Sequence, residues 1–215
     1  MRWKAGSGRL FFLFLRLNRE YMYANLIKAI ERFIRLDNTE TALLEKLFTV
    51  KQFSKGDFFL KEGQVCKDVG FIEKGIVRYF INHEGEELNY GFGQDNNFVC
   101  NYESFLDHSP SSKNIQFIEP ATLLSISYDN LQVMYEGLRE GQRFGRLVCE
   151  QIFVESLRQI TSFYTDQPEQ RYIHFIRSYP DLQQRIPQYH ISSYVGVKPQ
   201  SLSRIRKRLA DSGKS

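Results

Sequence analysis

The fold is most constrained by the spacing of apolar residues near the C-terminus, in the stretch HISSYVGVKPQSLSRIRKRLAD at positions 190–211. Ile191 and Val195 stand four positions apart, as on one face of a short helix. Gly196 follows directly and can take the positive φ angle of a tight turn. Three more apolar residues recur at spacings of three and four, which predicts a second helix with a narrow buried stripe. They are Leu202, Ile205 and Leu209. The stretch therefore predicts a helix-turn-helix unit.

The second helix of this unit is predicted to present a basic face to DNA. Pro199 suits its first position, where a missing N–H costs nothing. Between Lys198 and Arg208 there are five basic residues and no acidic one, whereas a merely solvated helix, the alternative, usually mixes both signs. The residues expected to contact DNA are Lys198, Gln200, Ser201, Ser203, Arg204, Lys207 and Arg208. Arg204 and Gln200 are expected at base edges, the serines as adaptable contacts, and the other three at phosphates.

The charge of the chain is unevenly distributed. Residues 166–215 contain nine Lys and Arg against four acidic residues, whereas residues 22–165 contain fifteen against twenty. The hydrophobic share of 42% is enough for an ordinary buried core. A basic C-terminal part after an acidic body is typical of a nucleic-acid-binding module joined to a sensing or assembly module.

The three cysteines are far apart, odd in number and without a CxxC pair, so neither a disulfide framework nor a metal site is predicted. We therefore expect a reducing cytoplasm and no cofactor. Residues 1–21 contain a short apolar run that is interrupted by Arg16 and is too short to span a membrane. We expect this segment to be a disordered extension or a misassigned start before Met22, with a weak signal peptide as the alternative. No membrane partner is expected.

The middle of the chain changes its pattern twice. Helical spacing in 23–48, with Asp37 or Asn38 as a cap for the second helix, predicts two small helices. From 50 to about 127, short runs rich in Phe, Tyr, Val and Ile alternate with turns at intervals of about 8 to 12 residues. This pattern predicts an all-β unit, an antiparallel roll or barrel.

A long helix is predicted from about 140 to 165, and it carries apolar residues on two faces. The first face contains Phe144, Leu147, Val148 and Ile152. The opposite face contains Phe153, Leu157, Ile160 and Tyr164. Because a helix packed only on its own domain needs one apolar face, the second predicts a partner, most simply the same helix of a second subunit. The alternative is that this face covers the C-terminal domain of the same chain.

Residues 166–169 should end the long helix. Pro168 then begins a new helix, which supports the helix-turn-helix unit through an apolar stripe. The stripe consists of Tyr172, Ile173, Phe175 and Ile176. An extended piece is expected at 184–187.

This order of elements resembles the CRP/FNR family of bacterial transcription regulators over residues 22–211. The resemblance is carried by Lys55-Gly56, Glu62-Gly63, Gly75, Gly85-Glu86-Glu87 and Ile191–Leu209. It implies an α+β fold with an antiparallel β-roll of the cyclic nucleotide-binding, jelly-roll type, a long dimerisation helix and a C-terminal helix-turn-helix (winged-helix-like) domain. After the extension at 1–21, the implied domains are a sensor domain at 22–137, the dimerisation helix at 138–165 and the DNA-binding domain at 166–215.

The effector pocket departs from the family pattern. Members that bind cyclic AMP carry a Gly-Glu pair and an Arg-Ser or Arg-Thr pair, where this chain has Cys100-Asn101 and Ser111-Ser112. Without the arginine, a cyclic phosphate loses a charge-assisted hydrogen bond of about 1.5–3 kcal/mol. Lys113 could replace it, but on a strand it would point to the opposite face from its neighbour. The pocket residues implied by the resemblance are Phe98, Cys100, Asn101, Ser111, Ser112 and Lys113.

These inferences predict a dimeric, sequence-specific DNA-binding regulator that is not an enzyme and whose effector is unknown and not cyclic AMP. Double-stranded DNA and a second copy of the chain are the expected partners; RNA polymerase and a small-molecule effector are further candidates. One alternative is a cyclic-AMP-responsive regulator with a non-standard pocket. Another is a cupin-like metal enzyme, disfavoured because only His83 and His108 lie in the roll. A cluster-type iron–sulfur sensor is disfavoured because residues 1–50 contain no cysteine.

Overall fold

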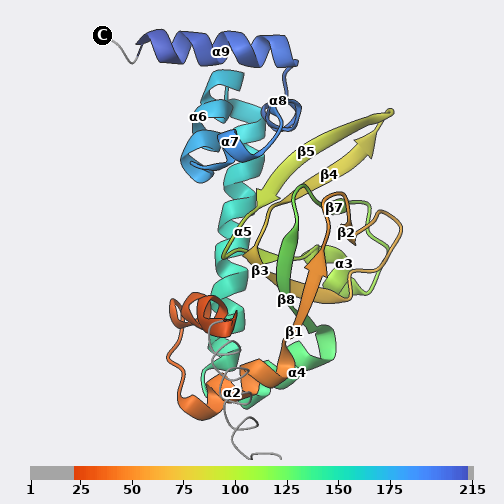
Figure 1. Cartoon of the computed structure of the whole chain (residues 1–215), viewed down its shortest axis with the longest axis vertical. Helices are drawn as coiled ribbons and strands as arrows, with labels where there is room; N and C mark the ends of the chain where they lie inside the picture. The colour runs from red at the N-terminus through yellow and green to blue at the C-terminus, as the bar shows by residue number, and fades with distance from the viewer. Residues whose placement is uncertain (1–21, 213–215) are drawn as a thin grey trace, which may run out of the picture.

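The computed structural model describes residues 22–212, so the expectations for residues 1–21 lie outside the described part (Figure 1). The helical residues 22–31 are followed by α2 (Asn38–Leu47). The Asp37 side chain accepts a hydrogen bond from the Glu40 backbone N–H at 3.0 Å, and the Glu40 carboxylate accepts one from the Asp37 N–H at 2.9 Å. This reciprocal capping box fixes the start of α2. Of the two predicted caps, Asp37 is the one confirmed.

Eight strands then form two antiparallel sheets, as the turn spacing predicts. In spatial order, the first sheet contains β1 (Thr49–Phe53), β8 (Ala121–Ser127), β3 (Asp68–Lys74) and β6 (Phe98–Val99). The second contains β2 (Phe58–Leu60), β7 (Asn114–Phe117), β4 (Val77–His83) and β5 (Glu86–Gly93). Gly75, between β3 and β4, has a φ of 121°, and a Cβ there would lie 2.5 Å from the Ala121 Cβ. Only glycine fits this turn.

The prediction of an all-β unit is wrong at one place, because the helix α3 (Tyr102–Asp107) lies between β6 and β7. This helix is too short to show a helical period in the sequence. It forms because Ser104 and Phe105 are buried, and it ends at His108, whose φ of 51° is left-handed. The helix therefore depends on tertiary packing rather than on local pattern.

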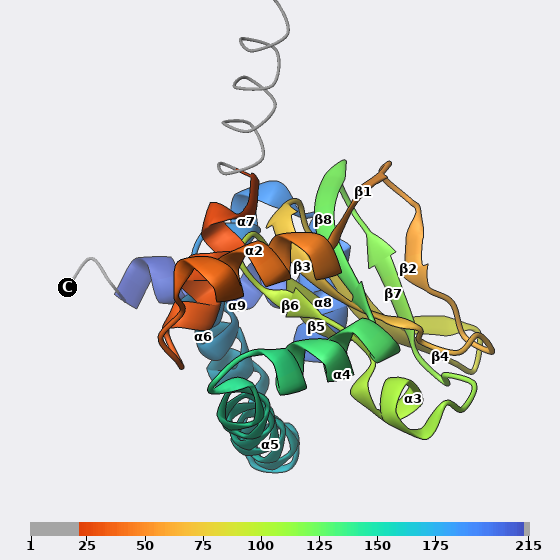
Figure 2. The ribbon, with the colours of Figure 1, turned by 90° about the horizontal axis from the view of Figure 1, so that it is seen from below.

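One core joins the roll to the helices around it. Phe71, Phe117, Leu123 and Leu124 from the sheets are fully buried together with Leu26 from the first helical segment. The same cluster includes residues of α4 (Tyr128–Gly137) and Phe144 near the start of α5 (Gly141–Thr165). Beyond its first turns, α5 extends past this core and lies alongside the roll. Figure 1 shows the helix from the side, and Figure 2 shows it close to end-on. The predicted long helix is confirmed.

Four helices follow α5 and share a second core. They are α6 (Pro168–Ser178), α7 (Leu182–Arg185), α8 (Gln188–Val195) and α9 (Pro199–Ser212). The second core contains Phe175, Leu182, Ile191, Val195 and Leu202, all fully or almost fully buried. No helix in the described part of the chain is long and apolar enough to cross a membrane.

The prediction of an extended piece at 184–187 is wrong for Gln184 and Arg185, which belong to the helix α7, and is confirmed for Ile186, whose backbone is extended. Leu182 and Ile186 are four positions apart and both are buried in the second core. One helical turn brings both side chains to the same side, and burial of this pair outweighs the weak local signal.

Candidate nucleic-acid interface and cavity

The turn between α8 and α9 has the geometry that the sequence predicts. Ile191 and Val195 are buried, and Gly196 has a φ of 74°, in the left-handed region. The Gly196 N–H donates to the Ser193 carbonyl at 3.1 Å, and the Val197 N–H donates to the Ser192 carbonyl at 2.9 Å. Backbone groups at the end of α8 are thereby satisfied, and the chain is turned sharply into α9.

The helix α9 separates its apolar and polar residues as expected. Leu202 and Ile205 are buried, while Leu209 and Arg206 are half-buried. Each residue expected to contact DNA is exposed: Lys198, Gln200, Ser201, Ser203, Arg204, Lys207 and Arg208. The helix forms the end of the molecule farthest from the small helices that precede the roll (Figure 1). The polar face of α9 is therefore accessible to a long partner such as double-stranded nucleic acid.

Two of these residues already have partners within the chain. Arg208 forms an ion pair with Glu169 of α6 at 2.9 Å, in which the Arg208 side chain is exposed and the Glu169 side chain is half-buried. The Ser203 hydroxyl donates to the Pro199 carbonyl at 3.1 Å. Because an exposed ion pair contributes only up to about 1 kcal/mol, a phosphate can compete with Glu169 for Arg208.

Arg171 on α6 is a positioning residue that the sequence analysis did not single out. Its Nε donates to the Val195 carbonyl at 2.8 Å, and one terminal nitrogen donates to the Asp166 carbonyl at 2.7 Å. The side chain thus ties the end of α5 to the end of α8. No local signal distinguishes it from the exposed arginines of α9.

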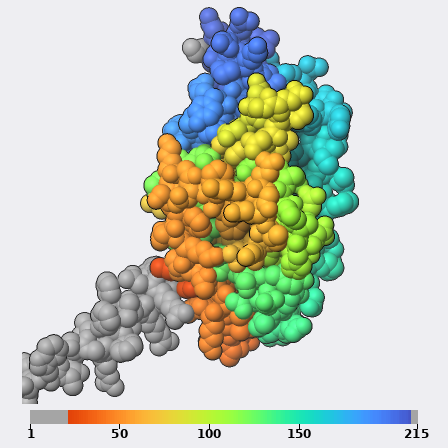
Figure 3. All heavy atoms as spheres, turned by 90° about the vertical axis from the view of Figure 1, so that its right-hand side faces the viewer, coloured from red at the N-terminus to blue at the C-terminus, as the bar shows by residue number. Residues whose placement is uncertain are grey.

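The helix-turn-helix unit docks on the roll through α8 and β5. The Asn89 backbone N–H donates to the Ser193 hydroxyl at 2.9 Å, and this hydroxyl donates to the Glu87 carbonyl at 3.0 Å. The Asn89 side-chain amide donates to the His190 carbonyl at 3.3 Å. Figure 3 shows the hairpin of β4 and β5, in yellow, directly against the C-terminal helices.

Aromatic and charged contacts strengthen this docking. Phe92 on β5 packs edge-to-face on Phe175 and on Tyr179, with ring centroids 5.9 Å apart in both pairs. Arg185 on α7 forms ion pairs with Glu119 and, at 3.3 Å, with Asp95. The roll and the C-terminal helices therefore share a packed interface.

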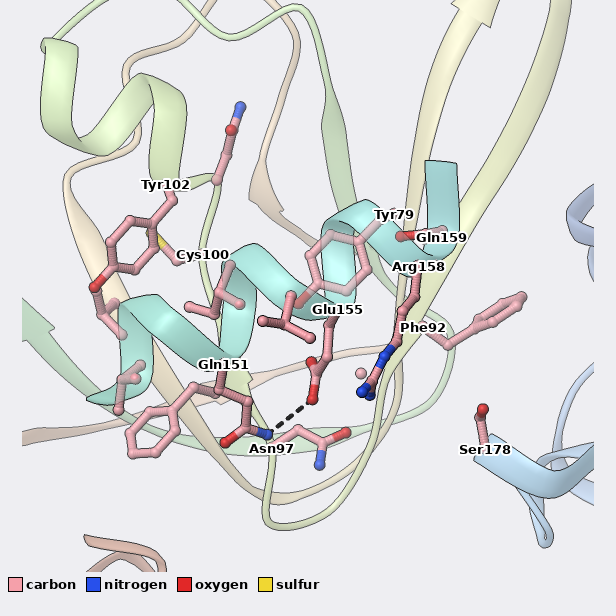
Figure 4. A pocket seen from close by; sticks show the side chains of 18 of the residues that line it. Tyr79, Phe92, Asn97, Cys100, Tyr102, Gln151, Glu155, Arg158, Gln159 and Ser178 are labelled. Carbon is pink, nitrogen blue, oxygen red and sulfur yellow. Dashed lines mark hydrogen bonds between the residues drawn. The ribbon is translucent and has the colours of Figure 1, made fainter. Parts of the chain in front are cut away.

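A cavity of about 1630 Å³ lies between the roll and α5 (Figure 4). Aromatic side chains from the roll form much of its wall, and α5 contributes a polar row. The aromatic residues include Tyr79, Tyr90, Phe92, Phe98 and Tyr102, and the polar row consists of Gln151, Glu155, Arg158 and Gln159. Burial raises the pKa of the Tyr79 and Tyr90 hydroxyls, so both remain neutral hydrogen-bonding groups at neutral pH.

The predicted effector residues fall into two groups. Phe98, Cys100, Asn101 and Lys113 line the cavity, whereas Ser111 and Ser112 do not. Instead, the buried Ser111 hydroxyl accepts a hydrogen bond from the Asn101 amide at 2.7 Å and donates to the Lys113 carbonyl at 2.8 Å. The polar groups at these positions therefore satisfy one another.

Lys113 does not point away from the cavity, so the prediction from strand alternation is wrong. Lys113 lies in the bend before β7, where the two-residue period does not apply, and it lines the cavity. Its ammonium nitrogen lies 2.7 Å from a Glu103 carboxylate oxygen. The hydrogen bond from Lys113 lowers the pKa of Glu103, and the carboxylate of Glu103 neutralises the charge of Lys113.

The second apolar face of α5 is open in the single chain. Exposed fractions are 65% for Phe153, 49% for Leu157, 55% for Ile160 and 84% for Tyr164. The alternative in which the C-terminal helices of the same chain cover these residues is therefore wrong. Val148 and Phe144 of the first face pack on the roll, as predicted, while Ile152 is partly exposed at the edge of the cavity.

Histidines and carboxylates do not gather in the roll. Among residues 22–212, no group of three or more His, Cys, Asp or Glu side chains could hold a metal ion. His108 packs against Tyr128 with ring centroids 4.6 Å apart, and His83 is exposed at the end of β4. These residues offer no support for a cupin-like centre.

Known proteins share this architecture. Residues 50–137 match the model of the cyclic nucleotide-binding domain family. The comparison with curated proteins gave no match. The structure is similar to the catabolite activator protein of Thermus thermophilus, with a TM-score of 0.53 and 18% identity over 84% of this chain and 87% of that one.

Two further solved structures have a similar fold. The c-di-GMP-responsive regulator CLP of Xanthomonas campestris has a TM-score of 0.62 and 14% identity, over 82% of this chain and 93% of that one. A transcriptional regulator of the CRP/FNR family from Eubacterium rectale has a TM-score of 0.62 and 12% identity, over 83% and 85%. Residues 50–137 are thus similar to the cyclic nucleotide-binding domain. The fold of the chain as a whole is that of the CRP/FNR-type regulators, which confirms the predicted fold class and the resemblance.

Proposed function

We propose that the protein is a sequence-specific DNA-binding transcription regulator of the CRP/FNR type, without enzymatic activity. The observation that carries this proposal is the polar face of α9, where Gln200, Arg204 and Lys207 are exposed opposite the buried Leu202 and Ile205. Between positions 198 and 208 no acidic residue interrupts that face. A basic helix held by a tight turn suits the major groove.

The side chains divide between base reading and backbone contact. Arg204 is proposed for a bidentate contact to guanine and Gln200 for a base edge, because both are long and exposed near the start of the helix. Ser201 and Ser203 serve as adaptable contacts. We propose that phosphates are neutralised by Lys198, Lys207 and Arg208. Arg208 would exchange its ion pair with Glu169 for one with a phosphate.

The protein is proposed to act as a homodimer through the exposed face of α5. Isolated apolar residues are common on protein surfaces, but four large ones on one helix face favour burial against a partner. Helices paired in this way would present two α9 helices to successive major grooves, about 34 Å apart, on a roughly two-fold symmetric operator. The proposed domains remain 22–137, 138–165 and 166–215. Most of the first core lies within 22–137, whereas the second core joins residues of 166–215 to Ile76 and Phe92 of the roll.

The effector is proposed to be a small molecule other than cyclic AMP, bound in the cavity between the roll and α5. Support comes from Lys113, which is paired with Glu103, and from Ser111, which is bonded to Asn101. A cyclic phosphate placed as in the family would have to break these contacts, and Ser111 stands where the family has its arginine. RNA polymerase is proposed as a further partner and the cytoplasm as the location, both from the regulator fold alone.

Selection of bound sequences from random double-stranded DNA tests the proposal most directly. The full chain is used, with and without cell extract as a source of effector. Enrichment of a two-fold symmetric motif is expected. A matched selection with Lys46→Ala on α2, far from α9, should return the same motif. If no preferred sequence is enriched either with or without cell extract, sequence-specific binding is contradicted.

A further inference from the structure

Two cysteines that are far apart in the sequence meet inside the roll. The Sγ atoms of Cys66 and Cys100 lie 3.8 Å apart. Cys66 is buried just before β3, and Cys100 directly follows β6. The antiparallel register of β3 and β6, which pairs Gly70 with Val99, brings these two ends together. A disulfide needs sulfur atoms about 2.0 Å apart, so a small movement from 3.8 Å suffices.

The surroundings give the two sulfur atoms different properties. The hydrogen bond with Cys100 lowers the pKa of the Cys66 thiol to about 7, and backbone hydrogen bonds with Asn101 and Asp68 add to this effect. Burial raises the pKa of the Cys100 thiol. Because the thiolate is the nucleophile, Cys66 is the more reactive sulfur toward a small oxidant.

Both cysteines line cavities, although Cys66 is buried. Cys100 lies in the wall of the large cavity beside α5. Cys66 lines a second cavity of about 530 Å³, together with Phe59, Lys67 and Asp68. A molecule as small as hydrogen peroxide can therefore approach the pair from either side.

We propose that Cys66 and Cys100 form a peroxide-sensitive dithiol in the roll, with Cys66 as the attacking sulfur and Cys100 as the resolving one. The Cys66 thiolate attacks one peroxide oxygen, the O–O bond breaks, and a sulfenic acid forms while hydroxide leaves. The Cys100 sulfur then attacks the Cys66 sulfur, the S–O bond breaks, and water leaves with the Cys100 proton. Two thiols are oxidised to one disulfide as one peroxide is reduced to two waters, because the leaving hydroxide takes up the proton that the Cys66 thiol released.

The position of the pair links this chemistry to the long helix. Phe98, two residues before Cys100, packs on Phe144 of α5, with ring centroids 6.5 Å apart. Asn101, the next residue, precedes α3 and also lines the cavity. Closing the disulfide pulls on a short segment that contacts both α5 and the cavity.

The test uses the full chain with the exposed Cys149 replaced, C149S, so that only the proposed pair reports. After treatment with one equivalent of hydrogen peroxide, the protein is denatured, alkylated and weighed by mass spectrometry. A monomeric chain that has lost two hydrogen atoms and carries no alkyl group is expected. Two alkylated thiols, or a disulfide between chains in place of the internal one, would overturn the proposal.

Single-cysteine chains separate the two roles. With Cys66 alone (C100S in the C149S background), a sulfenic acid that dimedone traps is expected. With Cys100 alone (C66S in the same background), no trapped product is expected under the same exposure. Equal trapping in both chains overturns the assignment of Cys66 as the attacking sulfur. No DNA is present in these measurements, so their outcome is independent of the proposed DNA binding.

Discussion

The Asn89 side-chain nitrogen on β5 lies 3.2 Å from Nδ1 of His190 on α8 and donates to the carbonyl of the same residue at 3.3 Å. Both side chains are buried at the interface between the roll and the helix-turn-helix unit. Arg78 of β4 reaches the same Asn89 amide at 3.5 Å and forms an ion pair with Glu87. One buried amide thus connects the second sheet of the roll to α8.

Replacing Asn89 should loosen this connection. Asn89→Ala leaves the His190 carbonyl and Nδ1 without this donor in a buried site, so we expect a loss of about 1–3 kcal/mol in the free energy of unfolding. Urea denaturation of the full chain measures it. The control is Asn82→Ala, which removes only an exposed hydrogen bond to Glu62 and should change little. Equal effects of the two variants would contradict a special role for Asn89.

The same contact predicts a pH dependence. Burial lowers the pKa of His190 to about 4, from 6.5, so the unfolded chain takes up a proton at higher pH than the folded chain. The stability contributed by neutral His190 is complete above about pH 6.5 and is lost as the pH falls toward 4. His190→Gln should flatten the decline of the urea midpoint between pH 7 and pH 5. His83→Gln, at an exposed site, should leave the decline intact.

Substitutions on α9 should separate base reading from phosphate contact. Arg204→Ala is expected to lower specific DNA affinity by about 1–3 kcal/mol and to relax one base position. Lys207→Ala should weaken binding to all sequences alike and lower the salt slope by about one. Binding titrations at several salt concentrations on specific and scrambled duplexes measure both. The assignment fails when the two variants behave identically.

The exposed face of α5 predicts the oligomeric state. Sedimentation equilibrium at micromolar concentration should show a dimer, and Phe153→Glu with Leu157→Glu should give monomers, because charges would be buried without partners. Val133→Glu on α4 is the matched control, since Val133 is also an exposed apolar residue, at 47%. A monomeric starting protein would contradict the proposed dimer.

Calorimetric titration tests the cavity. We expect no micromolar binding of cyclic AMP. Glu103 neutralises Lys113, and the position at which cyclic-AMP-binding members have an arginine is occupied by Ser111, which is bonded to Asn101. Glu103→Gln removes the competing carboxylate and should raise affinity for a phosphate-bearing ligand. Micromolar binding by the unaltered chain would overturn the proposal that the effector is not cyclic AMP.

Local patterns predicted the helices and the roll well. The spacing of Ile191, Val195, Leu202 and Ile205 predicted which side chains are buried in α8 and α9, and Gly196 marked the turn. The long helix and its open second face were also predicted, because helical period and residue type act over neighbouring residues. Short helices such as α3 and α7 were missed, since a single turn is stabilised by burial and not by its own pattern.

The amino-acid sequence by itself determined where the longer helices, the strands and most turns form and which face of each long helix is apolar, because these depend on neighbours along the chain. The short helices α3 and α7 are the exceptions. Only the tertiary structure decided which distant residues meet. It brings Cys66 to Cys100, Asn89 to His190, and Arg171 to Val195. Such contacts depend on how whole helices and strands pack against one another. The residues next to a side chain in the sequence do not indicate which distant residue it contacts.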